Sequence, residues 1–261
     1  MICRLCGNEN LVLYYTQGNR DQFKYYKCPN CKLVNYELST GQDQMKYTAE
    51  KYLDPYDETN ILNKHQSETF SFIQKKIKKP GSLLDIGCGN GKILVLGRDN
   101  GWKVRGLELS PSLADSISEK FGIEVTISNF LTYEPAKEEQ YDLVILRHVL
   151  EHLQDSILAM TKINQLLKPG GFGVLEFPDI ESNQMKLKRF ISGIGIYSKK
   201  YKETYLPGHC NEFCEESFKY LLSKTGFKLL EWQNYSSKSY LNGVYNLLHF
   251  GTKARVLIKK I

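Results

Sequence analysis

"SLLDIGCGNGKILVLGRDNGWKVRGLELS" (residues 82–110) is the stretch that decides the fold. It reads as a short apolar strand, a glycine-rich turn (Gly87-x-Gly89-x-Gly91), a helix with apolar periodicity, and a second strand that ends at Glu108. Glycines let backbone N–H groups approach a ligand closely, and the N-terminus of the following helix favours anionic groups. An acidic side chain at the end of the second strand can accept both hydroxyls of a ribose. The segment therefore predicts an α/β fold that binds a ribose-containing ligand.

The spacing of the glycines separates two kinds of ligand. Nicotinamide-binding folds favour G-x-G-x-x-G, whereas this chain has G-x-G-x-G, preceded by Asp85. The "LDIGCGNG" form resembles motif I of class I S-adenosylmethionine-dependent methyltransferases. The resemblance implies that Asp85 lies beneath the methionine part of the cofactor or orders the glycine loop. It also implies that Gly87 and Gly89 clear space for the cofactor and that Glu108 binds its ribose.

Three later segments resemble the next motifs of this family in the expected order. "EVTISNFLTYE" (124–134) is similar to the third strand and adenine loop, "YDLVILRHVLEHLQD" (141–155) to the fourth strand and motif IV, and "INQLLKPGGFGVLEFPD" (163–179) to the helix, turn and fifth strand. The resemblance covers about residues 65–250 and implies a Rossmann-like, seven-stranded α/β sheet, largely parallel and ending in an antiparallel edge strand. For the C-terminal residues 242–261, two predictions stay open: a helix followed by the last strand, or one basic amphipathic helix.

The resemblance implies a cofactor site built from the glycine loop and from three strand ends: Asp85, Gly87, Cys88, Gly89, Gly91, Glu108, Leu109, Asn129, Phe130 and Arg147. Asn129 departs from the family, which often has an acidic residue there, but an amide can still donate to and accept from the adenine edge. Phe130 either stacks on the adenine or packs beside it. Methyl transfer from a sulfonium is an in-line displacement, so the main work is positioning, and a base is needed only if the acceptor loses a proton.

Two histidines are candidates for that base. "LPGHCNEF" (206–213) resembles a Pro-x-His-x-x-x-Phe segment of methyltransferases that modify sugars and other small molecules. We expect this segment to lie over the cofactor cleft, and imidazole titrates near neutral pH, so His209 is the first candidate. His148, directly after the fourth strand, is the second. The alternative for each is a packed or surface histidine without a catalytic role.

His148 also begins the pattern His148-x-x-Glu151-His152, which in inverted zinc proteases places metal ligands on one helix face. Related quinone O-methyltransferases carry a Glu-x-x-Glu-His segment that can hold Mg²⁺. Here His148 replaces the first glutamate, and imidazole suits softer metals than Mg²⁺. The context therefore favours cofactor and acceptor contacts by Arg147 and His148, and packing or capping by Glu151 and His152, over a metal.

The N-terminus carries a separate metal signature, Cys3-x-x-Cys6 followed by Cys28-x-x-Cys31. The β-rich runs "LVLYY" and "FKYYK" between the two pairs predict a hairpin. Two such knuckles at the base of a hairpin present four thiolates, which suits a structural Zn²⁺ because four cysteines leave no open position. We therefore predict a zinc ribbon.

Length and composition agree with this organisation. The 261 residues are 41% hydrophobic, the chain has no apolar run long enough to cross a membrane, and its start lacks the layout of a signal peptide. We therefore expect a cytoplasmic protein, in which Cys210 and Cys214 are buried thiols. The predicted division is a ribbon (1–38), a linker and helical lid (39–80), and a methyltransferase domain (81–261) with a basic insertion at 180–210. Tyr47 and Tyr52 either close over the cleft or pack.

The net charge of +6 lies outside the central block, because residues 81–180 carry 9 basic and 14 acidic side chains. Lysine-rich runs at 75–79, 186–189 and 198–202 either attract a phosphorylated molecule or nucleic acid, or form a solvated face. The resemblance favours methylation of a hydroxyl on a sugar, free, phosphorylated or nucleotide-linked, in surface-polysaccharide biosynthesis. The alternatives are an RNA base methyltransferase that uses the ribbon to hold RNA, and a non-catalytic binding protein.

Overall fold

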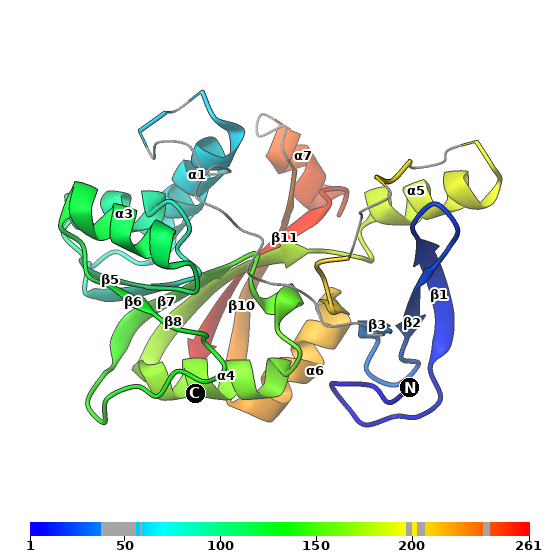
Figure 1. Cartoon of the computed structure of the whole chain (residues 1–261), viewed down its shortest axis with the longest axis horizontal. Helices are drawn as coiled ribbons and strands as arrows, with labels where there is room; N and C mark the ends of the chain where they lie inside the picture. Colours follow the sequence, from blue (N-terminus) through cyan, green and yellow to red (C-terminus); the bar gives the residue numbers. More distant parts are fainter. Residues whose placement is uncertain (38–55, 58, 197–199, 203–206, 237–240) are drawn as a thin grey trace.

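The computed structural model describes residues 1–37, 56–57, 59–196, 200–202, 207–236 and 241–261. Its centre is a seven-stranded sheet, with a smaller four-stranded sheet at the N-terminal side (Figure 1). In spatial order the strands of the large sheet are β10 (Phe227–Tyr235), β11 (Lys253–Lys260), β8 (Leu167–Pro178), β7 (Tyr141–Arg147), β4 (Ser82–Ile86), β5 (Lys103–Glu108) and β6 (Val125–Ile127).

The large sheet is parallel except for one strand. The neighbours β8, β7, β4, β5 and β6 all pair in parallel, whereas β11 is antiparallel to both β8 and β10. The antiparallel strand therefore lies one position in from the edge, which corrects our expectation of an antiparallel edge strand. Burial agrees with this order of the two C-terminal strands. Residues Ala254–Ile258 of β11 are all buried, as expected inside the sheet, whereas most positions of β10 are partly or fully exposed, as expected at an edge. The C-terminus forms a short helix, α7 (Asn242–Leu247), followed by β11, which settles the two predictions left open for it.

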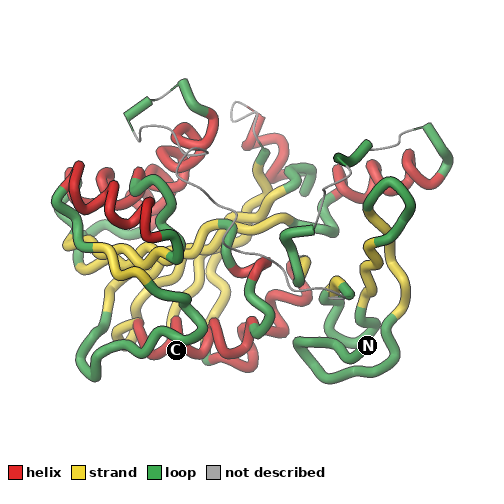
Figure 2. The backbone as a smooth tube through the Cα atoms, viewed as in Figure 1, coloured by secondary structure: helices red, strands yellow, loops and turns green. Residues whose placement is uncertain are grey.

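Helices cover both faces of this sheet and give the predicted α/β/α layers (Figures 1 and 2). On one face, α1 (Ile61–Lys76), α2 (Lys92–Asp99) and α3 (Pro111–Phe121) enclose one apolar core, and on the other, α4 (Ser156–Leu166) and α6 (Glu215–Thr225) enclose a second. Successive residues of β4 serve both cores, because Leu83 packs in the first and Leu84 in the second. In the described residues, no helix is long and apolar enough to cross a membrane.

The N-terminal sheet combines the predicted hairpin with a strand from a distant part of the chain. Strands β1 (Val12–Gln17), β2 (Phe23–Lys27) and β3 (Val34–Tyr36) pair antiparallel in sequence order, and β3 then pairs with β9 (Asn211–Glu212) of the "LPGHCNEF" segment. Arg4 strengthens this junction: its Nε donates to Asn211 Oδ1 at 3.0 Å, and its guanidinium also donates to the carbonyl of Cys210. The N-terminal sheet therefore includes a strand from the segment that carries His209.

The segment after β8 forms α5 (Asn183–Gly193), which carries the run at 186–189 and has no buried residue. After β7, a short 3₁₀ turn, η3 (Leu150–His152), leads into α4. Tyr47 and Tyr52, considered above as an aromatic lid, lie outside the described residues. Cys210 and Cys214 are buried, as predicted.

Candidate functional site

A cavity of about 230 Å³ lies at the carboxyl ends of β4, β5 and β7. Nearly all of the predicted cofactor residues line it, namely Asp85, Gly87, Cys88, Gly89, Glu108, Leu109, Asn129, Phe130 and Arg147. Gly91 does not line the cavity; it caps α2 with a φ of 75°, and a Cβ there would lie 3.0 Å from Cγ1 of Ile117 in α3. Gly91 therefore shapes the loop and allows α2 and α3 to pack closely.

The glycine loop is held against the end of β5 by one carboxylate. Glu108 Oε2 accepts from the Gly89 N–H at 3.0 Å, and its Oε1 accepts from the N–H groups of Leu109 and Ser110 at 2.9 and 3.0 Å. Gly87 has a φ of 70°, and a Cβ at that position would lie 2.5 Å from Cγ2 of Val149. The cavity wall thus requires glycine at this point both for its backbone conformation and for its space.

Asp85 lies at the bottom of this wall and is 3% exposed. Burial raises the pKa of Asp85 to about 7, and the nearby Glu108 and Glu176 carboxylates act in the same direction against the opposing charge of Arg147. A cationic ligand in the cavity would favour the ionised form of Asp85 and lower this pKa again. The site is thus electrostatically suited to a ligand with positive charge.

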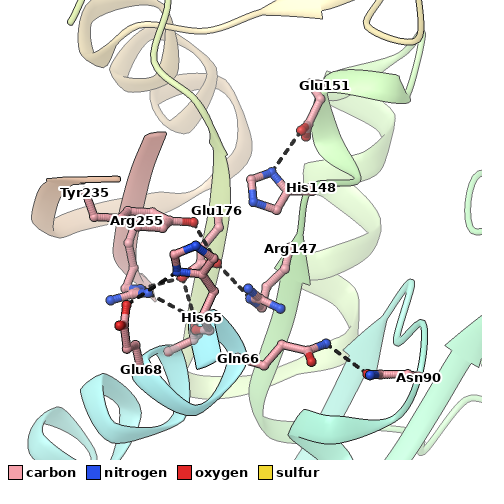
Figure 3. Close-up of polar contacts among 11 residues, drawn as sticks. His65, Gln66, Glu68, Asn90, Arg147, His148, Glu151, Glu176, Tyr235 and Arg255 are labelled. Atoms are coloured by element: carbon pink, nitrogen blue, oxygen red, sulfur yellow. Dashed lines mark hydrogen bonds and ion pairs between the residues drawn. The ribbon is translucent and has the colours of Figure 1, made fainter. Parts of the chain in front are cut away.

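Beside the cavity lies a buried network centred on Glu176, a residue that the sequence did not single out (Figure 3). Its Oε2 accepts from Arg147 Nε at 2.7 Å and from the Tyr235 hydroxyl at 2.9 Å, and its Oε1 accepts from Thr69 Oγ1 at 2.6 Å and from Arg255 Nε. Glu176 has no exposed surface. The signal for it was an isolated charge within an otherwise apolar strand, because a buried charge needs a partner.

Helix α1 contributes a second residue that the sequence did not identify. Gln66 lines the cavity, and its Nε2 donates to Asn90 Oδ1 of the glycine loop at 3.2 Å (Figure 3). Its Oε1 is buried and has no hydrogen-bond partner in the described part of the chain. This oxygen is therefore available to a donor on a ligand.

The two histidine candidates differ in their position relative to the cavity. His148 follows β7 with a φ of 55°, lines the cavity, and places Nδ1 3.3 Å from Glu151 Oε1 (Figure 3). His209 does not line the cavity, but its ring meets that of His152 edge-on with the centroids 5.0 Å apart, and His152 does line it. Burial lowers the pKa of His152. Burial acts in the same direction on His209, but the hydrogen bond to Glu212 and the charge of Glu151 outweigh it, so the pKa of His209 is raised.

The four N-terminal cysteines meet in one cluster and are suited to Zn²⁺. Cys3 and Cys31 have their Sγ atoms 3.5 Å apart, as do Cys6 and Cys28, and all four sulfurs lie within 4.8 Å of one another. Tetrahedral Zn²⁺ with Zn–S bonds of about 2.3 Å spaces its sulfurs by about 3.8 Å. The hydrogen bond from Cys31 lowers the pKa of Cys3 to about 4, whereas the same hydrogen bond raises the pKa of Cys31 and burial raises that of Cys28.

Residues 60–231 match the family model described as "Methyltransferase domain". The chain belongs to this methyltransferase family. It is 29% identical over 130 residues to an uncharacterized methyltransferase of Schizosaccharomyces pombe, a match covering 43% of this chain and 45% of that protein. It is 24% identical over 199 residues to the ubiquinone biosynthesis O-methyltransferase of Rickettsia bellii, covering 73% of this chain and 78% of the relative.

Solved structures show the same fold. Magnesium protoporphyrin IX methyltransferase from Synechocystis, determined with bound S-adenosylhomocysteine, superposes with a TM-score of 0.55 at 16% identity, covering 77% of this chain and 88% of that one. The family assignment makes this methyltransferase a member of the S-adenosylmethionine-dependent class. The cavity fits that cofactor, because the Gly87 cradle leaves the space that a side chain would fill and because Glu108 ends β5 at its wall.

Proposed function

We propose that this methyltransferase transfers a methyl group from S-adenosylmethionine to a hydroxyl of a small-molecule acceptor, a sugar in free, phosphorylated or nucleotide-linked form, in surface-polysaccharide biosynthesis. One observation carries the proposal: the cavity that contains the glycine loop and Glu108 is also lined by His148 and His152. Cofactor and acceptor residues thus share one space, as an in-line transfer requires.

Each part of the cofactor has a group positioned for it. We expect Glu108 to accept from the ribose, Asn129 and Phe130 to contact the adenine, and Asp85 to lie toward the methionine part, because all four residues line the cavity. When bound, the cofactor supplies a methyl group activated by the positive charge of its sulfonium. Ionised Asp85 favours that charge, and Arg147 is fixed by Glu176 so that it keeps its place in the wall.

The acceptor's hydroxyl must lose a proton, and His148 is the imidazole on the cavity wall. We assign His148 the proton-accepting role ahead of His209, which reverses the order suggested by the sequence. His209 contacts the ring of His152 but does not itself line the cavity. Replacing His148 with Gln is therefore expected to lower kcat more than it raises KM, whereas a packed histidine without this role would leave kcat nearly unchanged.

For the ribbon, we propose a structural zinc and a positioning role. Two of its cations are engaged within the molecule, because Arg4 binds the β9 segment and Lys27 pairs with Glu181 at 2.6 Å. A ribbon that holds RNA uses its cations for phosphates. This arrangement supports the small-molecule acceptor over RNA.

Isothermal titration with S-adenosylmethionine tests the cofactor site. We expect Glu108→Gln to weaken binding by about tenfold or more, because a charged acceptor is lost, whereas Glu124→Gln at an exposed side chain should bind like the wild type. Equal affinity of all three proteins would contradict the assignment. A screen of nucleotide sugars and sugar phosphates with methyl-labelled cofactor tests the acceptor class, and labelling of structured RNA or of quinols alone would overturn it.

A further inference from the structure

Three side chains from two distant segments meet beside the cofactor cavity. Glu151 and His152 belong to η3, and His209 precedes β9. Each of the three brings one ligand atom to a place where the three atoms all lie within 4.8 Å of one another. Two imidazoles and one carboxylate are a donor set that divalent transition metals prefer.

The carboxylate of Glu151 is incompletely satisfied. Glu151 is 1% exposed, and its Oε1 lies 3.3 Å from His148 Nδ1. Its Oε2 is also buried and, among the described residues, has no hydrogen-bond partner. A buried carboxylate oxygen without a donor is costly, so this atom needs a cation beside it.

Both imidazoles are oriented by their Nδ1 atoms. His152 Nδ1 lies 2.7 Å from the carbonyl oxygen of Gly208, and since a carbonyl only accepts, Nδ1 carries the proton. In the neutral ring, Nε2 is then the nitrogen with the lone pair. His209 Nδ1 lies 3.5 Å from Glu212 Oε1, which favours the same tautomer. Proteins commonly fix metal-binding histidines by such contacts to carbonyls and carboxylates.

The backbone holds the two segments together. The Cys210 N–H donates to the Glu151 carbonyl at 2.9 Å, and Asn211 Nδ2 donates to the Leu153 carbonyl at 2.7 Å. Asn211 is in turn paired with the ribbon through β9 and bound by Arg4. The two segments that carry the three side chains are thus held together by hydrogen bonds outside the cluster itself.

We propose that Glu151, His152 and His209 bind a divalent transition metal, separate from the four-cysteine site of the ribbon. Three protein ligands leave coordination positions open, as in catalytic metal sites, whereas four cysteines close theirs. Imidazoles favour Zn²⁺, Fe²⁺ or Ni²⁺ over Mg²⁺. His152 also lines the cavity, so the open side of the metal borders the acceptor.

The role of this metal rests on the proposed function. A bound divalent cation lowers the pKa of an oxygen ligand, so the acceptor's hydroxyl gives up its proton to His148 and on to solvent. The oxygen lone pair then forms the new C–O bond, and the electrons of the broken C–S bond stay on sulfur. The products are a methyl ether, S-adenosylhomocysteine and one proton, and the metal is unchanged.

Mn²⁺ is a suitable probe, because it is paramagnetic, binds carboxylate ligands, and does not compete with Zn²⁺ for four thiolates. Full-length protein, with its zinc content measured first, is titrated with Mn²⁺ and free Mn²⁺ is counted by electron paramagnetic resonance. We expect one Mn²⁺ per chain, with affinity at least about tenfold weaker in Glu151→Gln and in His209→Asn. Enhanced water-proton relaxation by the bound ion would show the open positions.

His249→Asn serves as the matched control, because it also removes a histidine, and asparagine tolerates its φ of 48°. Its Mn²⁺ affinity should equal that of the wild type. No Mn²⁺ or Co²⁺ binding by the folded wild type, or equal binding by both ligand variants, would overturn the proposal. Circular dichroism identifies a variant that fails to fold, and the other variant then decides.

Titration of S-adenosylmethionine into the same samples separates the two proposals. If the wild type binds the cofactor but not Mn²⁺, the metal-site proposal is refuted and the proposed methyl transfer is not. If the wild type binds Mn²⁺ but not the cofactor, the proposed function is refuted and the metal-site proposal is not. Glu151→Gln should bind the cofactor as the wild type does, since Glu151 does not line the cavity.

Discussion

Replacing Glu176 with glutamine should destabilise the whole sheet. The carboxylate is fully buried and accepts from two guanidinium groups, those of Arg147 and Arg255, as well as from two hydroxyls. Glutamine keeps the shape but removes the charge, which leaves both arginines buried without compensation. Breaking a buried ion pair in this way costs about 3–5 kcal/mol, which corresponds to a Tm lower by roughly 6–20 °C for a domain of this size.

Urea denaturation followed by circular dichroism measures this free energy of unfolding. The control is Glu215→Gln, which removes the exposed i,i+4 partner of Lys219 and should cost about 0.5 kcal/mol or less. If Glu176→Gln costs less than about 1 kcal/mol, the carboxylate is not the charge centre of the network.

The same experiment has a pH signature. Burial alone would raise the pKa of Glu176, but Arg147 and Arg255 lower it well below its usual range. A lowered pKa gives stability that is present above the unfolded value of about 4.3 and is lost as the pH falls toward the folded value. The difference between wild type and Glu176→Gln should therefore be constant from pH 6 to 8 and should narrow only below about pH 4.

Further predictions concern the cavity and the ribbon. Gly87→Ala should lose cofactor affinity because its methyl group would meet Val149, whereas Gly122→Ala, with a φ of 62° and open space, should only cost about 1 kcal/mol of stability. Equal cofactor affinity of the two variants would remove the steric argument. Because the raised pKa of Asp85, about 7, opposes its ionisation, cofactor affinity should rise by up to about tenfold from pH 6 to pH 7.5, and this rise should be absent in Asp85→Asn. Without the cofactor, the same raised pKa makes Asp85 more destabilising as the pH rises through 7, so the stability gap to Asp85→Asn should widen. Metal analysis of the purified protein should find at least one zinc per chain, and Cys28→Ser should contain one zinc fewer than the wild type and have a less stable ribbon; an unchanged zinc content would contradict the four-cysteine ligand set.

Local patterns in the sequence are sufficient to predict the part of the fold that surrounds the glycine loop. The strand, glycine turn, helix and strand of residues 82–110 are encoded by nearest neighbours, and the structure confirms them. The position of β11 inside the sheet could not be predicted in this way, because it depends on which of two C-terminal strands buries both faces. That choice is made by packing against β8, far away in the sequence.

Most of the candidate cavity was also predictable, because its residues lie at strand ends and in turns with a recognisable motif. Glu176 and Gln66 were missed for a physical reason: their roles come from partners on other elements. Glu176 stands in an ordinary apolar strand until Arg255 and Tyr235 are placed beside it. The partnership of His209 with Glu151 is of the same kind, since only the folded chain brings these segments together.

The ribbon is structurally connected to the segment that carries His209, because β3 pairs with β9. β9 is only two residues long. It pairs with β3 on one side, and on the other side the Cys210 N–H donates to the Glu151 carbonyl and Asn211 Nδ2 donates to the Leu153 carbonyl of the η3 segment. Ordering each backbone residue costs about 1–2 kcal/mol, which a strand of this length cannot offset by itself. If the four cysteines bind zinc as proposed, removing that zinc should weaken the β3 side of this support and loosen His209 beside Glu151 and His152. The glycine loop is instead held by Glu108 at the end of β5, so we expect cofactor binding to survive the loss of that zinc. On this proposal, the N-terminal sheet acts as a support for the segment that carries His209.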